Sequence, residues 1–140
     1  MNLFAQLDKL SNNAKVVFLI DAIGALLSAL FIFIILNYFE NQIGLPAKTL
    51  IFLIIIAIVL SIFSFCCYLF QNNNLKQNLK VISRANILYC ILTIFTLFAY
   101  RQVITKLGLL YFIFEIFIIF LIVKVELKTI YKLNDKWANG

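Results

Sequence analysis

Long apolar runs dominate the chain and predict four helices that cross a membrane. A helix needs about 20 mostly apolar residues to cross a hydrocarbon core of roughly 30 Å. Four runs have about this length, at 16–36, 50–70, 87–104 and 107–123. None alternates apolar and polar positions as the strands of a membrane barrel do. We therefore predict an all-α polytopic membrane protein, a bundle of four transmembrane helices at about 16–37, 48–70, 86–104 and 107–127.

The segments between these runs predict one membrane domain over residues 1–140. Apolar residues at helical spacing predict an interfacial segment over 1–14, with a frayed tail as the alternative. Pro46 is expected at the start of the second helix. The polar segment 71–84 predicts an interfacial helical turn, and the short connection at 105–106 predicts a tight hairpin of the last two helices. Residues 128–140 are expected to form a basic tail.

The distribution of Lys and Arg predicts the orientation of the chain. With the amino terminus inside, nine of these residues lie on the cytoplasmic side and three on the other side, Lys48, Arg101 and Lys106. Cytoplasmic loops carry the excess of positive charge, so we expect both termini in the cytoplasm. The net charge of +6 then suits anionic lipid headgroups on that side and is weak evidence for binding nucleic acid.

Composition agrees with a membrane location. Hydrophobic residues make up 64% of the chain, charged residues 13%, and the mean hydropathy is +1.04. The first apolar run is longer than the core of a signal peptide and no small-residue cleavage site follows it. We therefore expect it to remain as a helix of a multi-pass protein of a bacterial inner membrane.

One carboxylate interrupts the first apolar run. Asp21 lies about five residues into the predicted helix, at a depth of roughly 7 Å. A charge at this depth costs up to about 3 kcal/mol and normally faces a protein partner or water. Small residues that let another helix approach follow on the same face, namely Gly24, Ala25, Ser28 and Ala29. We expect Asp21 to point into the bundle or into a contact between subunits.

A second acid, Glu115, lies near the middle of the fourth predicted helix, roughly 12 Å from its outer end. It shares one helix face with Gly108 and Tyr111. Arg101, across the short connection, is the expected counter-ion, and an ion pair would neutralise both groups and lock the hairpin. In the alternative, Arg101 extends outward to the interface and Glu115 is protonated.

The third predicted helix carries a polar stripe whose members are three or four residues apart: Asn86, Tyr89, Thr93, Thr96 and Tyr100. Such a stripe belongs inside a membrane protein, where it either bonds neighbouring helices or lines a wet cavity. Both interpretations stay open. The candidate intramembrane polar site therefore comprises this stripe together with Asp21, Ser28, Arg101, Tyr111 and Glu115.

Other chemistry is sparse. Cys66, Cys67 and Cys90 form no C-x-x-C motif, and we interpret them as buried free thiols that act as small hydrophobes. The chain has no histidine, so we expect no zinc or haem site and no cofactor. We find no nucleotide-binding glycine loop, no nucleophile paired with a base, and no carboxylate pair at one depth. An enzyme is therefore not expected.

Four segments carry a resemblance to a known group of proteins: FLIDAIGALLSA (18–29), FENQIGLP (39–46), RANILYCILT (84–93) and LGLLYFIFEIFIIFLIVKVELK (107–128). Together they resemble small uncharacterised four-helix membrane proteins of Bacteroidetes-type bacteria. This resemblance implies no activity. The chain does not resemble the small multidrug transporters, because their other membrane motifs are missing from it.

Two functions are compatible with these features. The first is a non-catalytic subunit or scaffold whose small-residue face binds another membrane protein or a second copy of the chain. The second is a small transporter or channel in which Asp21 or Glu115 exchanges protons or binds a cation. A water-accessible cavity that reaches either acid would favour transport, whereas dry packing with Arg101 paired to Glu115 would favour the structural role.

Overall fold

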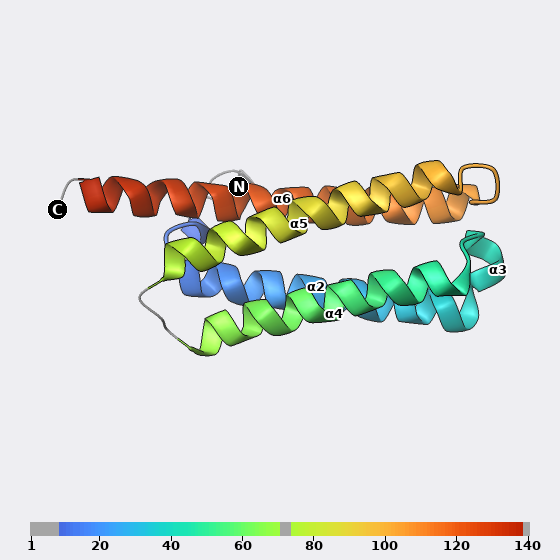
Figure 1. The fold of residues 1–140 in the computed structure, drawn as a ribbon, viewed down its shortest axis with the longest axis horizontal. Helices are drawn as coiled ribbons and strands as arrows, with labels where there is room; N and C mark the ends of the chain where they lie inside the picture. Colours follow the sequence, from blue (N-terminus) through green and yellow to red (C-terminus); the bar gives the residue numbers. More distant parts are fainter. Residues whose placement is uncertain (1–8, 71–73, 139–140) are drawn as a thin grey trace.

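The computed structural model describes residues 9–70 and 74–138 and is helical throughout, without a strand in these two ranges. Its helices are α2 (Ala14–Tyr38), α3 (Glu40–Ile43), α4 (Ala47–Leu69), α5 (Leu75–Ala99) and α6 (Lys106–Ala138) (Figure 1). All but the short α3 are long and apolar enough to cross a membrane. The predicted all-α bundle of four membrane-spanning helices is confirmed, and the chain is a multi-pass membrane protein.

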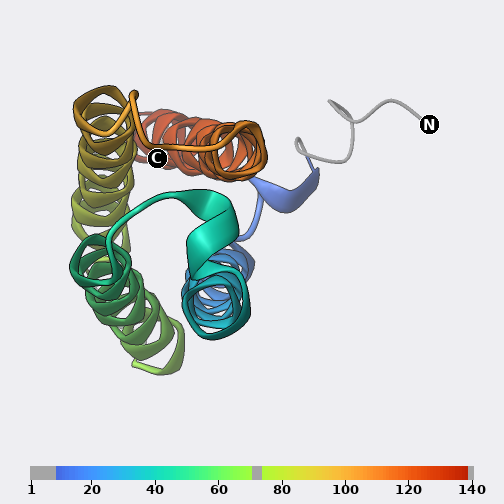
Figure 2. The ribbon, with the colours of Figure 1, turned by 90° about the vertical axis from the view of Figure 1, so that its right-hand side faces the viewer.

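The four long helices form two antiparallel hairpins. α2 packs along α4, and α5 packs along α6, while α2 and α6 contact each other more sparsely (Figures 1 and 2). The start of α2 and the end of α6 lie at the same end of the bundle (Figure 1). We call this end the terminal end, and the end with α3 the loop end. The assignment of the terminal end to the cytoplasm stays a prediction.

The chain enters α2 through a capped turn. Asn13 is the N-cap, and its side-chain oxygen accepts a hydrogen bond of 3.1 Å from the Lys15 amide. Lys132 of α6 donates to Ser11 at 2.6 Å and to the Asn12 side chain at 2.7 Å. These bonds tie the turn before α2 to the end of α6. Most of the predicted interfacial segment, residues 1–8, lies outside the described residues.

The third membrane helix does not have the predicted bounds. The prediction placed it at 86–104 after a separate helical turn in 71–84, but α5 is continuous from Leu75 and ends at Ala99. Leu79 and Ile82 explain the early start, because both are fully buried against the bundle and continue its apolar face. From Leu75 onward, the polar segment therefore forms the first part of this membrane helix.

The fourth membrane helix is also longer than predicted. The prediction ended it at 127 and assigned 128–140 to a basic tail, but α6 is one helix from Lys106 to Ala138. Thr129 and Ile130 are buried, and the Thr129 hydroxyl donates to the Val125 carbonyl at 2.8 Å. Buried residues at helical spacing therefore keep this segment packed against the bundle, although lysines lie between them.

The two loops at the loop end interlock. The amide of Thr105, between α5 and α6, donates to the Ile43 carbonyl at 3.0 Å, and its hydroxyl donates to the Gln42 carbonyl. Gly44 has a φ of +80°, and a side chain there would collide with the Val103 carbonyl. The helix α3, which the sequence did not predict, brings these carbonyls to the second hairpin and so joins the two hairpins.

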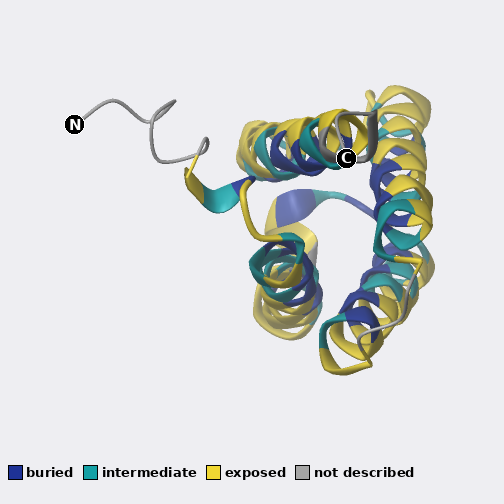
Figure 3. Cartoon of the chain, turned by 90° about the vertical axis from the view of Figure 1, so that its left-hand side faces the viewer, coloured by how far each residue is buried: buried dark blue, intermediate teal, exposed yellow. Residues whose placement is uncertain are grey.

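Buried apolar residues form two clusters along the bundle. The cluster at the loop end includes Ile32, Leu53 and Phe112, and the cluster at the terminal end includes Phe18 and Ile82. Exposed side chains cover the outer faces of all four helices (Figure 3). They are mostly large and apolar, as expected where lipid replaces water.

Candidate functional site

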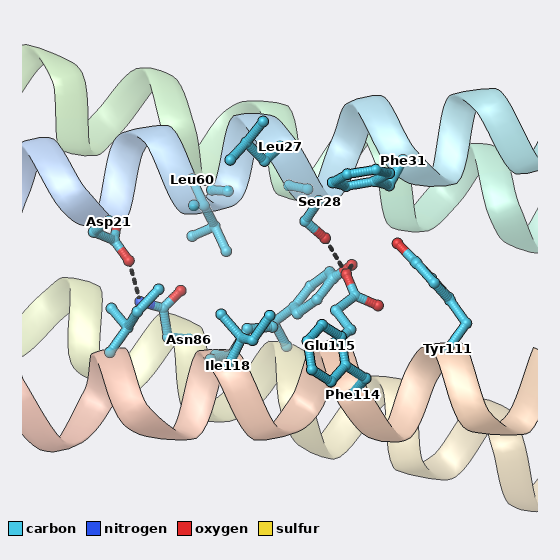
Figure 4. A pocket seen from close by; sticks show the side chains of 16 residues that line it. Asp21, Leu27, Ser28, Phe31, Leu60, Asn86, Tyr111, Phe114, Glu115 and Ile118 are labelled. Carbon is cyan, nitrogen blue, oxygen red and sulfur yellow. Dashed lines mark hydrogen bonds between the residues drawn. The ribbon is translucent and has the colours of Figure 1, made fainter. Parts of the chain in front are cut away.

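A cavity of about 340 Å³ lies inside the bundle, between α2 and α6, with α4 and α5 behind it (Figure 4). Its lining is mainly apolar. The polar exceptions come from α2, α5 and α6: Asp21, Ser28, Asn86, Tyr89, Tyr111 and Glu115. All six were predicted from the sequence to belong to an intramembrane polar site. The fold brings Asp21 and Glu115, which were predicted to lie at different depths, to one cavity.

Glu115 reaches the cavity from α6 and is only 6% exposed. One of its carboxyl oxygens, Oε1, accepts a hydrogen bond from the Ser28 hydroxyl and another of 3.2 Å from the Tyr89 hydroxyl. The other, Oε2, is buried and has no hydrogen-bond partner within the part of the chain that the structure describes. Tyr111 lies on the same side of the cavity (Figure 4). We call Glu115, Ser28, Tyr89 and Tyr111 the central acid site.

A second polar group lies closer to the terminal end. The Asn86 side-chain amide donates to Asp21 Oδ1 at 2.6 Å and to Glu126 Oε1 at 3.1 Å. The Ser64 hydroxyl of α4 donates to Asp21 Oδ2. Asn86 thus joins the carboxyls of Asp21 and Glu126, which lie on different helices. We call these four residues the four-helix polar layer, because each long helix contributes one of them.

Glu126 is the residue that sequence reasoning missed. It was not named as a member of the candidate site, yet its side chain is fully buried. The statement that no two carboxylates share one depth is therefore wrong, since Asp21 and Glu126 meet at Asn86. A signal was present in the spacing: Glu126 follows Glu115 by about three turns of 3.6 residues, so both acids lie on one face of α6.

Arg101 does not lie at Glu115. Its side chain is exposed, and its guanidinium carbon lies 5.0 Å from the centroid of the Phe98 ring at the loop end. Glu115 instead takes its hydrogen bonds from the hydroxyls of Ser28 and Tyr89. The expected ion pair is thus replaced by the alternative geometry in which Arg101 extends outward.

The polar stripe of α5 divides into parts with different partners. Asn86 and Tyr89 bond other helices, as described above. The hydroxyls of Thr93 and Thr96 donate at 2.9 Å to the carbonyls of Tyr89 and Leu92 in their own helix. They contribute no bond between helices. Tyr100 lies at the loop end, where the Thr49 hydroxyl donates to it at 3.4 Å.

The small-residue face of α2 points into the chain itself. Gly24, Ala25 and Ser28 line the cavity, and Ala29 is buried. A side-chain carbon added at Gly24 would come within 2.9 Å of Ile122 on α6. Of the two predicted alternatives, the interior of the bundle or a contact between subunits, the structure has the first.

The three cysteines are free thiols, in agreement with the prediction, but not all are buried. Cys67 is buried, Cys90 is half-buried and Cys66 is exposed. Successive residues of a helix point about 100° apart, so Cys66 and Cys67 of α4 cannot share the inward face. The described residues contain no group of three His, Cys, Asp or Glu side chains that could hold a metal ion.

Comparisons with protein families, with curated proteins and with solved structures found no match. The resemblance to small four-helix membrane proteins of Bacteroidetes-type bacteria therefore stays a prediction. Function must be argued from the site itself.

Proposed function

We propose that the protein is a small membrane transporter that exchanges a proton or another cation at the acids of its cavity. The observation that carries this proposal is the unpartnered oxygen of Glu115, which is buried at the wall of a cavity inside the bundle. Ionisable groups inside membrane proteins commonly mark pathways for ions or protons. The setting is taken to be a bacterial inner membrane with both termini in the cytoplasm.

Charge compensation is the physical reason for an exchange function. A buried carboxylate is costly unless a positive charge or a proton neutralises it. The described hydrogen-bond partners of Glu115 are neutral hydroxyls, and Arg101 lies elsewhere. The compensating charge must then come from outside the protein, as a proton or as a cation. Because either can satisfy the same oxygen, the two compete for one site.

A role as a subunit or scaffold of a membrane complex is the competing proposal. Its main support was the small-residue face of α2, of which Gly24 packs against Ile122 of α6 while Ala25 and Ser28 line the cavity. Purification of the chain in mild detergent, with identification of any protein that accompanies it, tests this role directly. Recovery of the chain alone counts against it.

The transport proposal is tested in proteoliposomes that enclose a pH-sensitive dye. A proton gradient is imposed, and its decay is followed after addition of sodium, potassium or ammonium chloride outside. We expect decay above that of protein-free liposomes, and we expect Glu115→Gln to abolish the excess. Asp21→Asn tests the acid of the four-helix polar layer in the same assay.

Asp135→Asn is the matched control, because this carboxyl is exposed on α6 and far along the chain from the cavity. It should leave the flux unchanged. Equal flux in the wild type and in both cavity variants would remove these acids as coupling groups. The amount of each variant inserted in the liposomes is measured, so that loss of folding is not counted as loss of flux.

A further inference from the structure

The mouth of the cavity faces lipid. Leu27 and Phe31 of α2 stand on one side of it, and Phe114 and Ile118 of α6 stand on the other. All four line the cavity and are between 41% and 61% exposed. At the middle of a membrane helix, exposed apolar side chains are in contact with acyl chains. A molecule that enters through this mouth therefore comes from the bilayer, and most of its surface must be apolar.

The interior of the cavity selects for positive charge. The free oxygen of Glu115 accepts hydrogen bonds or a cation and repels an anion. It is surrounded by hydroxyls and rings, not by further carboxylates, within the central acid site. Small divalent metal ions prefer several oxygen ligands with more negative charge. Asp21 also lines the cavity, but both of its carboxyl oxygens already accept hydrogen bonds, from Ser64 and Asn86. The one unpartnered carboxyl oxygen of the described lining residues, among aromatic rings, instead fits a monovalent cation with a diffuse charge.

Aromatic side chains give such a cation a second source of attraction. Tyr89, Tyr111, Phe31 and Phe114 all line the cavity. The face of an aromatic ring attracts organic ammonium groups, most strongly where water is excluded. The volume of about 340 Å³ is at the lower end of the range for small-molecule sites, roughly 300–1,000 Å³.

We propose that the cavity between α2 and α6 binds a lipophilic monovalent organic cation, which enters from the lipid and places its charge at Glu115. This proposal rests on the transport function proposed above and names the class of its substrate. The apolar groups of the cation fill the cavity between Leu27 and Ile118, and its charge replaces the proton that otherwise neutralises the acid.

Binding is tested with the full chain in dodecyl maltoside micelles by equilibrium dialysis. The probes are tetraethylammonium, tetrabutylammonium and tetraphenylphosphonium, which differ in size, and tetraphenylborate, which has the shape of the third probe and the opposite charge. Protein-free micelles provide the background. We expect saturable binding of at least one cation at one site per chain, and no saturable binding of the anion.

Two variants locate the site. Glu115→Gln removes the negative charge that attracts the cation and should weaken cation binding by roughly tenfold or more. Ala25→Phe leaves the acid in place but fills the cavity that Ala25 lines, and should abolish binding. Leu26→Phe is the matched control, because Leu26 is exposed on the outer face of α2 and is not part of the lining. Circular dichroism and gel filtration confirm that each variant folds.

The outcomes separate this inference from the transport proposal. Saturable binding of no cation, equal binding of the borate, or unchanged binding in both variants overturns the inference. If Glu115-dependent proton flux with inorganic cations persists in that case, the transport proposal stands without it. If cations bind at Glu115 but no flux is observed in liposomes, the site stands and the transport proposal fails.

Discussion

Replacing Asn86 with leucine tests whether the four-helix polar layer stabilises the fold. The Asn86 amide bridges Asp21 at 2.6 Å and Glu126 at 3.1 Å, and leucine has the same branched arrangement of side-chain heavy atoms but no donor. Hydrogen bonds between membrane helices contribute about 0.6 kcal/mol on average and up to about 1.7. We estimate about 1 kcal/mol for each bond and a loss of about 2 kcal/mol on Asn86→Leu.

The free energy of unfolding can be measured with a thiol that the protein already contains. Cys67 is buried and Cys66 is exposed, so a Cys66→Ala, Cys90→Ala background leaves one thiol that reacts with a maleimide only after unfolding. Labelling rates are recorded over a range of sodium dodecyl sulfate fractions in dodecyl maltoside. A change of about 2 kcal/mol raises the unfolded fraction roughly 30-fold at a given detergent composition.

Thr93→Val is the matched control in this assay. Thr93 is buried on the same face of α5, but its hydroxyl donates to the Tyr89 carbonyl in its own helix. We expect a change below about 0.5 kcal/mol, because no bond between helices is lost. If Asn86→Leu were as mild as Thr93→Val, or stabilising, the polar layer would not hold the helices together. The argument from its geometry would then be refuted.

Three further predictions concern other parts of the chain. Gly44→Ala should destabilise the fold by at least about 1–2 kcal/mol in the same assay, because of its positive φ and the Val103 carbonyl, while the exposed Asn41→Ala should have little effect. Lys132→Met should speed amide hydrogen exchange in residues 11–13 by removing two hydrogen bonds, and unchanged exchange would contradict this. In the folded protein, Cys66→Ala should remove most labelling by N-phenylmaleimide, whereas Cys67→Ala should not.

The membrane helices could be predicted from the sequence because apolar length alone determines them. Their ends could not. Leu75 to Ile82 and Thr129 to Ile130 lie in polar, lysine-rich segments, and only contact with the bundle shows that they are helical. The helix α3 depends on hydrogen bonds to Thr105, more than 60 residues away in the sequence, and no local pattern contains that information.

Most residues of the candidate site could be predicted from the sequence, but their hydrogen-bond partners could not. Periodicity placed Asn86 and Tyr89 on an inward face, and both line the cavity. Periodicity could not distinguish these two residues from Thr93, which has the same spacing but donates its hydrogen bond to a carbonyl of its own helix. Proximity in sequence favoured Arg101 as the partner of Glu115, while the structure pairs this acid with Ser28 of α2, 87 positions away. Pairing between helices depends on packing, which spacing within one helix does not specify.

Intramembrane acids and cations are separated in this fold. Lys15, Arg101 and Lys124 extend outward over the rings of Tyr68, Phe98 and Phe120 at 5.0–5.4 Å, whereas the three acids point inward. Asp21 and Glu126 both accept hydrogen bonds from the Asn86 amide, so within the four-helix polar layer these two acids serve to join helices.

Glu115 instead accepts hydrogen bonds from the hydroxyls of Ser28 and Tyr89, and its Oε2 has no hydrogen-bond partner among the described residues. A ligand that brings positive charge therefore gains more at Glu115, where it needs to displace no hydrogen bond between helices, than at Asp21. We infer that the acids have different tasks. Asp21→Asn should act mainly on stability and Glu115→Gln mainly on binding, and the reverse result in the two assays would contradict this division.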